Sequence, residues 1–407
     1  MIESKTSQWI NKCLINLFIV AALGVLMRYK IAFEFPFFSQ KNLQHAHSHF
    51  AFNGWVSLIL MILLVDTIKN RITETSLKSF NILFTISLIV SYGMLISFTM
   101  QGYGIYSIVL STLAIFISFW FAWHFFTILR EIKDIPGRDW MLAAIFFSVL
   151  SSLGTFWLSV MMASKNLDQH AYLASLYWYL HFQYNGWFFL ACVGLFINYL
   201  HLNGINISNE KQIFYLFAIS CVPTYGLSIL WLNLPNWVYT LIILATIAQF
   251  YALILMFRQL IKLKLFNELK LDFVAKILMV CFATALAIKF SLQFGSLFPA
   301  ISKFAFGFRH IVIAYLHLVL LAFTSVFLIS YSYFKGYILP SSSAKLGIML
   351  FVLGVFLNEL LLATQGIASI SYTMIPFVNE SLFVISILIS LGLVVLILAN
   401  FKHQKTT

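Results

Sequence analysis

Histidines inside apolar segments are the residues of this chain whose type and spacing could support chemistry. Six of the ten histidines fall on three such segments: His45, His47, His49, His181, His310 and His317. A neutral imidazole nitrogen is a good axial ligand for haem iron and a good ligand for copper. Burying polar groups in lipid is costly unless they have a role, although hydrogen bonds between helices would also satisfy them. The pattern therefore predicts a haem or metal site, with a purely structural role as the alternative.

Two of these segments share a motif, His-Phe-x-aromatic-Asn-Gly-Trp, which begins at His49 and at His181. His181 follows His49 by 132 residues and precedes His317 by 136, as expected of one four-helix unit used three times. Asn53 and Asn185 each follow their histidine by four residues, so they share its helix face and can act as proton or propionate partners there. The glycine lets a flat group or another helix approach the backbone. The segment around His317 lacks Asn-Gly-Trp, so the third unit rests on position alone.

Composition assigns the chain to the integral membrane proteins. Of 407 residues, 61% are hydrophobic and only 9% are charged, whereas a soluble domain carries about 25% charged residues. So little charge cannot cover a water-exposed globule of this size, and lipid must cover most of the surface. The net charge of +12 comes from basic residues in short loops, which orient a membrane protein, so we expect no nucleic acid partner. The four cysteines lie in apolar segments without paired spacing, and we interpret them as packing residues.

Twelve segments are apolar enough to span a bilayer, which requires roughly 20 mostly apolar residues. They are 9–30, 45–67, 79–100, 105–129, 140–164, 173–200, 211–232, 236–261, 272–295, 308–334, 345–366 and 379–401. We therefore predict an all-α integral membrane fold in which residues 1–407 form a single polytopic transmembrane domain. Its twelve transmembrane helices are expected to form three pseudo-symmetric four-helix arcs. Pro223 is expected to kink its helix and expose backbone carbonyls.

The distribution of Lys and Arg predicts that both termini are cytoplasmic. With that orientation six of the 25 basic residues lie on the outer side: Arg28, Lys30, Lys41, Lys165, Lys303 and Arg309. Lys289 lies within a helix, and the others lie on the cytoplasmic side, in accord with the positive-inside rule. At about 1.5 Å per residue, His49, His181 and His317 then lie in the outer half of the bilayer. We expect the protein in a bacterial inner (cytoplasmic) membrane, in contact with membrane lipid.

Two further ionisable residues, Lys289 and Glu359, lie deep in apolar runs. An ionisable residue inside the membrane is a functional hypothesis by default. Lys289 or Arg309 could pair with haem propionates, and Glu359 could relay protons. The alternative is a structural ion pair between Lys289 and Glu359.

Three short stretches carry a resemblance to a known family: Ala314–Leu320, Tyr177–His181, and the pair His47 and His49. They are similar to the helix 10, helix 6 and helix 2 ligand regions of subunit I of the haem–copper oxidase superfamily, which includes oxygen reductases and nitric oxide reductases. That family has twelve helices in three pseudo-symmetric arcs, with its metals nearer the outer face. The resemblance implies that His317, together with His49 or His47, holds a low-spin haem b.

The chain departs from that family at the dinuclear centre. Tyr315 stands where the family has its high-spin haem ligand, and the segment 211–232 has no histidine, so two of three copper ligands are missing. The resemblance implies that His181, with His310, could hold a second haem or a copper or other metal. It does not support a complete centre for four-electron oxygen reduction.

The leading hypothesis is an oxidase-like integral membrane haem protein that carries electrons or handles a diatomic gas, O2 or NO. Its redox partner would be cytochrome c or quinol, and any activity would be that of an oxidoreductase. The alternatives are a proton- or metal-coupled membrane transporter and a metal-free assembly subunit. The threefold spacing differs from the two halves usual in transporters.

Overall fold

The computed structural model describes residues 2–165 and 168–404, and this described part consists of helices without strands. Among these residues, eleven helices are long and apolar enough to cross a membrane. A twelfth span is possible if Glu210–Cys221 and Pro223–Ile229, which meet at a bend of 44°, are one broken helix. The expected all-helical, multi-span membrane fold is therefore confirmed, and so is the kink at Pro223.

The chain divides into two compact units. Unit 1 comprises Met1–Phe121, Asp272–Phe282 and Leu316–Thr407, and unit 2 comprises Ala122–Leu271 and Ala283–Tyr315. The prediction of a single domain over 1–407 stays a prediction. Of the histidines with expected roles, those at 47, 49 and 317 belong to unit 1, and those at 181 and 310 belong to unit 2.

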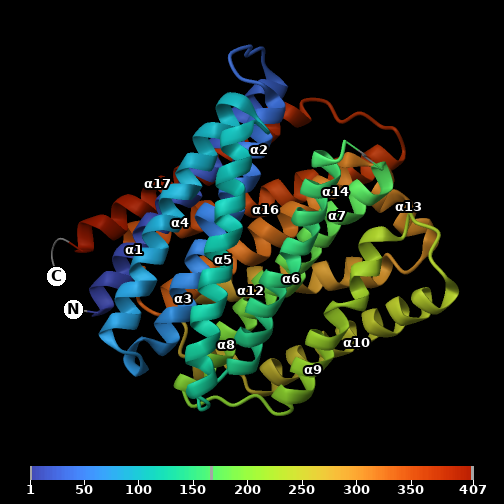
Figure 1. Ribbon diagram of the computed structural model, residues 1–407. Helices are drawn as coiled ribbons and strands as arrows, with labels where there is room; N and C mark the ends of the chain where they lie inside the picture. Colours follow the sequence, from blue (N-terminus) through green and yellow to red (C-terminus); the bar gives the residue numbers. More distant parts are fainter. Residues whose placement is uncertain (1, 166–167, 405–407) are drawn as a thin grey trace. The chain divides into compact units, whose positions relative to one another are not determined.

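The first part of unit 1 is built from long apolar helices joined by short capped turns (Figure 1). Its elements are α1 (Ile2–Ala32), α2 (Gln40–Phe50), η1 (Ala51–Ser57), α3 (Leu58–Ile68), η2 (Lys69–Arg71), α4 (Glu74–Gln101) and the larger part of α5 (Ile105–Glu131). Thr73 caps α4 by accepting a hydrogen bond from the Ser76 amide at 3.2 Å, which satisfies one of the amides left free at a helix start. The apolar runs thus set the helix lengths, and the polar residues between them set the ends.

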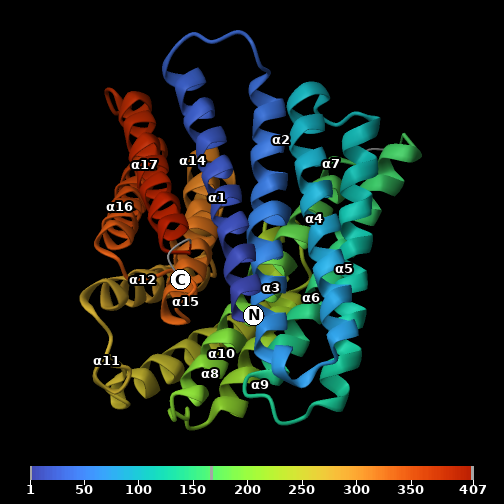
Figure 2. The same ribbon diagram turned by 90° about the vertical axis from the view of Figure 1, so that its left-hand side faces the viewer.

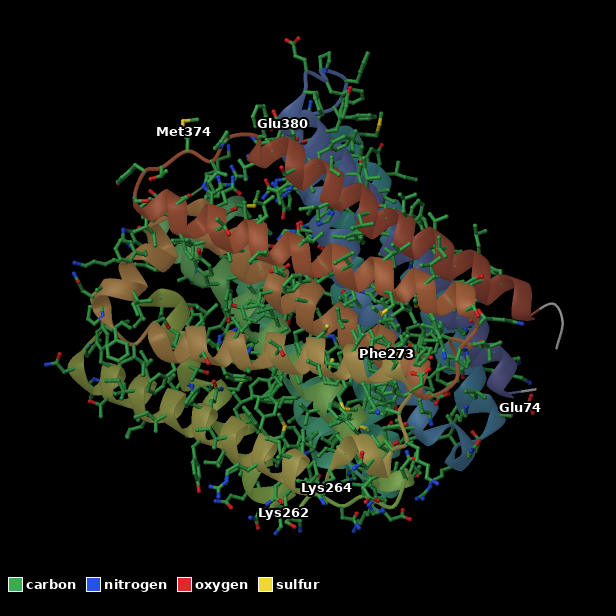
Figure 3. The ribbon with its side chains drawn as sticks, turned by 180° about the vertical axis from the view of Figure 1, so that it is seen from behind. Glu74, Lys262, Lys264, Phe273, Met374 and Glu380 are labelled. Atoms are coloured by element: carbon green, nitrogen blue, oxygen red, sulfur yellow. The ribbon has the colours of Figure 1, made fainter. Side chains whose placement is uncertain are left out.

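The second part of unit 1 completes its helical core. It contains the start of α12 (Phe273–Gly295), η5 (Leu318–Ser325), α15 (Val326–Phe334), α16 (Ser342–Ile370) and α17 (Val378–Gln404). In Figure 3, α16 and α17 run side by side, joined by the segment that carries Met374. Their backbones meet closely, because a Cβ added at Gly392 would lie 2.5 Å from the Phe351 amide nitrogen. Small residues at such crossings let membrane helices pack backbone to backbone.

The first and last helices of unit 1 lie side by side (Figure 2). Asn400 of α17 donates a hydrogen bond to Asn11 of α1 at 2.6 Å, and both side chains are buried. A second polar contact holds the start of α12, where Asp272 accepts from the Tyr333 hydroxyl at 2.7 Å and pairs with Lys345 at 2.8 Å. These bonds tie elements that are distant in the sequence.

Unit 2 holds the second copy of the sequence motif. Its elements are the end of α5, α6 (Arg138–Ala163), α7 (Gln169–His181), η3 (Phe182–Phe188), α8 (Phe189–Leu202), α9 (Glu210–Cys221), η4 (Pro223–Ile229), α10 (Asn236–Lys262), α11 (Leu265–Glu268), the end of α12, α13 (Pro299–Gly307) and most of α14 (Arg309–His317). Figure 3 shows Lys262 at the end of α10 and Lys264 in the turn that follows. The span formed by α7, η3 and α8 is largely buried, so it is the central helix of unit 2.

Candidate functional site

Each of the three histidine-bearing spans contains a π-helical segment just after its histidine. The segment η1 begins two residues after His49, whereas η3 and η5 begin directly after His181 and His317. A π-helix bonds each amide to the carbonyl five residues earlier; it is rare, and it is frequently found at functional sites. The feature is present in the third span too, where the Asn-Gly-Trp text is missing.

Side chains donate hydrogen bonds to backbone carbonyls of the π-helical segments η1 and η5. Asn16, on α1, donates to the Gly54 carbonyl of η1 at 2.6 Å and accepts from the Tyr92 hydroxyl at 2.9 Å. In η5, the Thr324 and Ser325 hydroxyls each donate to the carbonyl five residues earlier at 2.8 Å. Because carbonyls inside a membrane have no water to bond, these contacts stabilise the π-helical turns.

His47 faces α1 within unit 1. Its Nδ1 atom lies 3.0 Å from the Val20 carbonyl oxygen. A carbonyl can only accept, so Nδ1 carries the proton and Nε2 of the neutral ring keeps its lone pair. The imidazole of His317 and the guanidinium of Arg28 are both near enough to interact with His47 electrostatically. The structure thus groups two imidazoles and one cation in a single unit.

His49 faces the opposite side of α2. Its Nε2 atom lies 3.0 Å from the Tyr103 hydroxyl, and its ring stacks on Phe98 with centroids 4.2 Å apart. His45 lies against the same tyrosine at 4.6 Å, as its spacing of four residues predicts. Asn53 donates to the backbone carbonyl of His49 at 3.1 Å and not to the imidazole. The expected shared face of Asn53 and His49 is therefore used for backbone bonding.

His181, in unit 2, uses both of its ring nitrogens on protein partners. Its Nε2 lies 2.8 Å from the Cys221 carbonyl oxygen, and its Nδ1 lies 3.0 Å from the Asn185 side-chain amide. Since the carbonyl accepts, Nε2 is protonated and Nδ1 accepts from Asn185. The expected shared helix face thus brings Asn185 and His181 into contact, whereas the role of Asn185 as a proton or propionate partner stays a prediction. Metal binding through His181, whose side chain is enclosed, would require one of these two bonds to break.

A buried polar chain continues from Asn185. The Gln293 amide donates to the Asn185 carbonyl oxygen at 3.2 Å, and Lys289 donates to the Gln293 oxygen at 3.4 Å. The Tyr315 side chain is also hydrogen-bonded to Gln293. The Lys289 ammonium is 0% exposed and lies 4.0 Å above the Phe290 ring. The Lys289 ammonium is thus stabilised by a neutral amide oxygen and by an aromatic ring. These partners offset the free-energy cost of burying its charge less than a carboxylate would.

The helix break at Pro223 supplies the carbonyl that His181 binds. In an α-helix the Tyr225 amide would donate to the Cys221 carbonyl, but it donates to Val222 at 3.2 Å instead. The freed Cys221 oxygen accepts from His181. The predicted exposure of a carbonyl at this kink therefore has a definite partner.

The remaining predicted residues are Arg309, His310 and Glu359. Arg309 and His310 are exposed, in contrast with the enclosed His181 of the same unit. Glu359 accepts a hydrogen bond from the Asn358 amide at 3.2 Å. Because Glu359 belongs to unit 1 and Lys289 to unit 2, the predicted ion pair between them stays a prediction.

Metal ligands are sparse among the described residues. No group of three or more His, Cys, Asp or Glu side chains in residues 2–165 and 168–404 is arranged to hold a metal ion. His181 and His310 therefore gain no third ligand of these types there. The convergence of His49, His181 and His317 on a common cavity involves both units and stays a prediction.

Sequence reasoning missed the residues that orient the histidines. Val20 lies 27 residues from His47, and Tyr103 lies 54 residues from His49. Asn16 lies 38 residues from the Gly54 carbonyl that it caps. No local pattern signals such partners, although Asn16 stands out as an amide in an apolar helix.

Comparison with known proteins adds no family. No protein-family model matches the chain, and a search of curated proteins finds no match.

Proposed function

We propose that this chain is an oxidase-like integral membrane haem protein that holds a haem b between His47 and His317 and transfers electrons. The observation that carries the proposal is the hydrogen bond of His47 Nδ1 to the Val20 carbonyl, with His317 within electrostatic range. Histidines that bind metals usually donate their other ring N–H to a carbonyl or carboxylate, which fixes the tautomer and the ring orientation.

The residues present fit such a group better at His47 than at His49. The Nε2 of His47 keeps its lone pair, whereas the Nε2 of His49 is engaged with Tyr103 and its ring is covered by Phe98. Arg28, near His47, supplies a positive charge that suits a haem propionate. Within the pair left open by the sequence, we therefore propose His47 as the partner of His317.

Each protein group has a separate task in this proposal. Val20 holds the His47 ring, and Arg28, near His47, would offset the negative charge of a propionate at the edge of the site. A haem with two imidazole ligands has no open coordination position, so it supplies electron transfer and not gas binding. Cytochrome c or quinol would serve as the redox partner. A second haem or a copper at His181 and His310, which would handle O2 or NO, requires His181 to give up a hydrogen bond.

The π-helical segments support a threefold organisation of the chain. They begin one or two residues after His49, His181 and His317, one in each expected four-helix arc. We therefore propose three pseudo-symmetric arcs, both termini on the cytoplasmic side, and a bacterial cytoplasmic membrane as the location.

The test is pyridine haemochrome analysis and a visible spectrum of the protein purified from haem-replete cells. We expect a Soret band in the wild type, and haem content below about a tenth of that in His47→Ala and His317→Ala. The matched variants His49→Ala and His310→Ala should retain haem. Absence of a Soret band in the wild type rejects the proposal, and loss in His49→Ala with retention in His47→Ala overturns the choice of ligand.

A proton-coupled transporter is the second candidate, because the buried polar chain meets a broken helix in unit 2. Discontinuous helices frequently form transporter binding sites. Proton uptake into vesicles that contain haem-free protein, lost in Lys289→Met, would favour this candidate. Full function after replacing both His181 and His317 with Ala would instead point to a metal-free assembly subunit.

A further inference from the structure

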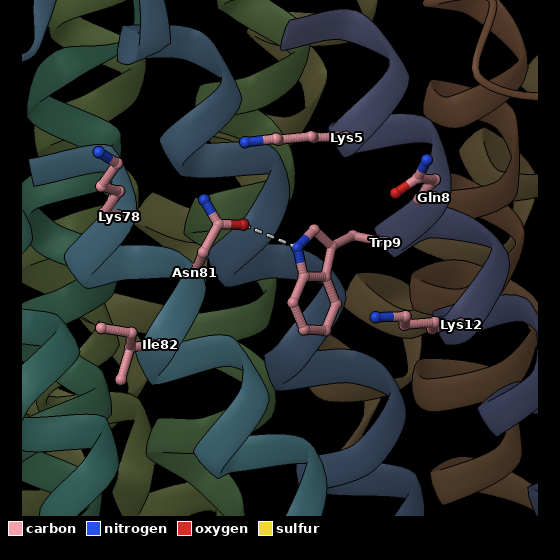
Figure 4. Close-up of a pocket in the computed structure, with 7 residues that line it drawn as sticks. All are labelled: Lys5, Gln8, Trp9, Lys12, Lys78, Asn81 and Ile82. Carbon is pink, nitrogen blue, oxygen red and sulfur yellow. Dashed lines mark hydrogen bonds between the residues drawn. The ribbon is translucent and has the colours of Figure 1, made fainter. Parts of the chain in front are cut away.

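A groove lies between the starts of α1 and α4 in unit 1 (Figure 4). Its volume is about 450 Å³. Six of its lining residues are Lys5, Trp9, Lys12, Lys78, Asn81 and Ile82. The groove is therefore bordered by three basic side chains and also by apolar ones, a combination that none of the candidate sites above uses.

The positive charge of the groove comes from two helices. Lys5 and Lys12 are seven residues apart on α1, so they lie on one face about 10.5 Å apart along the axis. In Figure 4, Lys5 extends from α1 towards α4, whereas the Lys12 ammonium lies beside the Trp9 ring. Lys78 joins them from α4, where it pairs with Glu74 at 3.2 Å, and both of those side chains are more than 70% exposed. An ion pair this exposed is weak. The described lining residues of the groove therefore carry a net positive charge.

The apolar wall of the groove is fixed in place. The Trp9 indole N–H donates to the Asn81 side-chain oxygen at 2.9 Å, which joins α1 to α4. The Lys12 ammonium lies 4.1 Å from the centroid of the Trp9 ring. Ile82 is 56% exposed one turn beyond Lys78 on the same face of α4. Charged groups and exposed hydrocarbon therefore follow one another along the same groove.

The depth of the groove matches the boundary of a membrane. Lys5 lies in the first turn of α1 (Ile2–Ala32), so Lys12 lies about two turns further along an apolar helix. Lysines at such positions extend their ammonium groups towards the lipid headgroups, and tryptophans are enriched at that level. The N-terminal ends of α1 and α4, which carry partial positive charge, meet at this place as well.

We propose that this groove binds one anionic phospholipid, with its phosphodiester among Lys5, Lys12 and Lys78 and an acyl chain along Ile82. Basic pockets between transmembrane helices are suited to anionic headgroups. A zwitterionic headgroup brings a cation of its own, which three lysines repel. Free phosphate would lack the contact with the apolar wall. The proposal is independent of haem, so failure of one leaves the other standing.

The test is native mass spectrometry of the full-length protein in detergent, titrated with dioleoyl phosphatidylglycerol. The test variant replaces Lys5, Lys12 and Lys78 with Gln. Each lysine near the membrane surface contributes about 1 kcal/mol to binding of anionic lipid. Because Glu74 partly neutralises Lys78, we expect about 30-fold weaker binding of the first lipid, which is roughly 2 kcal/mol at 1.4 kcal/mol per tenfold.

Matched variants separate a site from general attraction. The control replaces three exposed lysines outside the groove, Lys133, Lys211 and Lys262, with Gln, and its first-lipid affinity should change less than about threefold. A charge-preserving variant with Arg at the three groove positions should bind like the wild type. Dioleoyl phosphatidylcholine and glycerol phosphate should each fail to compete. Equal losses in the two Gln variants, or competition by phosphatidylcholine, overturns the proposal, and competition by glycerol phosphate alone reassigns the groove to soluble phosphates.

Discussion

The glycines of the repeated motif allow a direct test of what approaches the π-helical segments. A Cβ built at Gly186 in η3 would lie 2.4 Å from the Cβ atom of Phe147 on α6. That atom is attached to the helix backbone, and the Phe147 ring is stacked on Phe182 with centroids 5.6 Å apart. Gly186→Ala therefore cannot be relieved by turning a side chain, and α6 must move away from η3.

The required movement gives the size of the effect. The separation must grow from 2.4 Å to at least 3.4 Å, where ordinary van der Waals contact begins. Overpacking of this kind costs about 1–3 kcal/mol, and replacing a helical glycine with alanine returns at most about 1 kcal/mol. We therefore expect a net destabilisation of roughly 1–2 kcal/mol, after setting these two effects against each other.

Two other glycines provide graded controls. At Gly54 the added Cβ meets the far end of the Phe50 ring at 2.8 Å, which can shift, and at Gly24 it has only an ordinary contact at 3.8 Å. Stability should therefore fall most for Gly186→Ala, less for Gly54→Ala, and not at all for Gly24→Ala.

Thermal unfolding in detergent, followed with a thiol-reactive fluorescent maleimide, measures this order. The buried free cysteines Cys192 and Cys221 report on unit 2, and Cys13 reports on unit 1. The midpoint for Gly186→Ala should fall by roughly 2–8 °C, from about 2–4 °C per kcal/mol. A midpoint for Gly186→Ala equal to or above that of Gly24→Ala would refute the reasoning, because it would mean that Phe147 does not fill the space beside the motif glycine.

Three further predictions follow from contacts described above. Burial raises the pKa of Asp272, but hydrogen bonds, led by that from Lys345, lower it below its ordinary value. The ionised carboxylate therefore stabilises the fold fully above its unfolded-state pKa, and this stabilisation is lost as pH falls through the folded-state pKa. Asp272→Asn should flatten the decrease in stability below about pH 4, and an unchanged decrease would contradict this. Gly392→Ala should lower the unfolding midpoint more than any motif glycine does, because the new Cβ meets backbone at 2.5 Å; a wild-type midpoint would be inconsistent with the close helix crossing. Asn185→Leu should destabilise by about 1–3 kcal/mol by leaving the His181 Nδ1 atom without its donor, and Asn185→Asp, which cannot donate when ionised, should not rescue it.

The sequence predicted the spans well and the π-helical segments not at all. Each of the twelve predicted apolar segments corresponds to a helix or a broken helix pair, because length and hydropathy alone decide whether a segment can span a membrane. The motif at His49 and His181 coincides with two π-helical segments, but the sequence showed it only as a repeat. Nothing in the sequence around His317 indicated the third segment. Helical-face arguments assume 3.6 residues per turn, and a π-helical turn departs from that period.

The same limit applies to the candidate sites. Spacing placed Asn185 on the same helix face as His181, because the two residues are one helical turn apart, and only the structure showed the hydrogen bond between them. It could not choose between His47 and His49, since that choice depends on Val20 and Tyr103, which other helices provide. The groove bordered by Lys5, Lys12 and Lys78 could not be predicted from the sequence for the same reason, because two different helices, α1 and α4, supply its sides.

The sequence by itself determined that this is a polytopic helical membrane protein with imidazoles on three of its spans, because hydropathy and residue type are local properties of the chain. Tertiary structure decided which imidazole has a fixed tautomer, which one is enclosed by its own hydrogen bonds, and where three lysines meet a tryptophan. Those outcomes depend on carbonyls and side chains brought together from distant segments, and inside a bilayer every such polar group must find its partner within the protein.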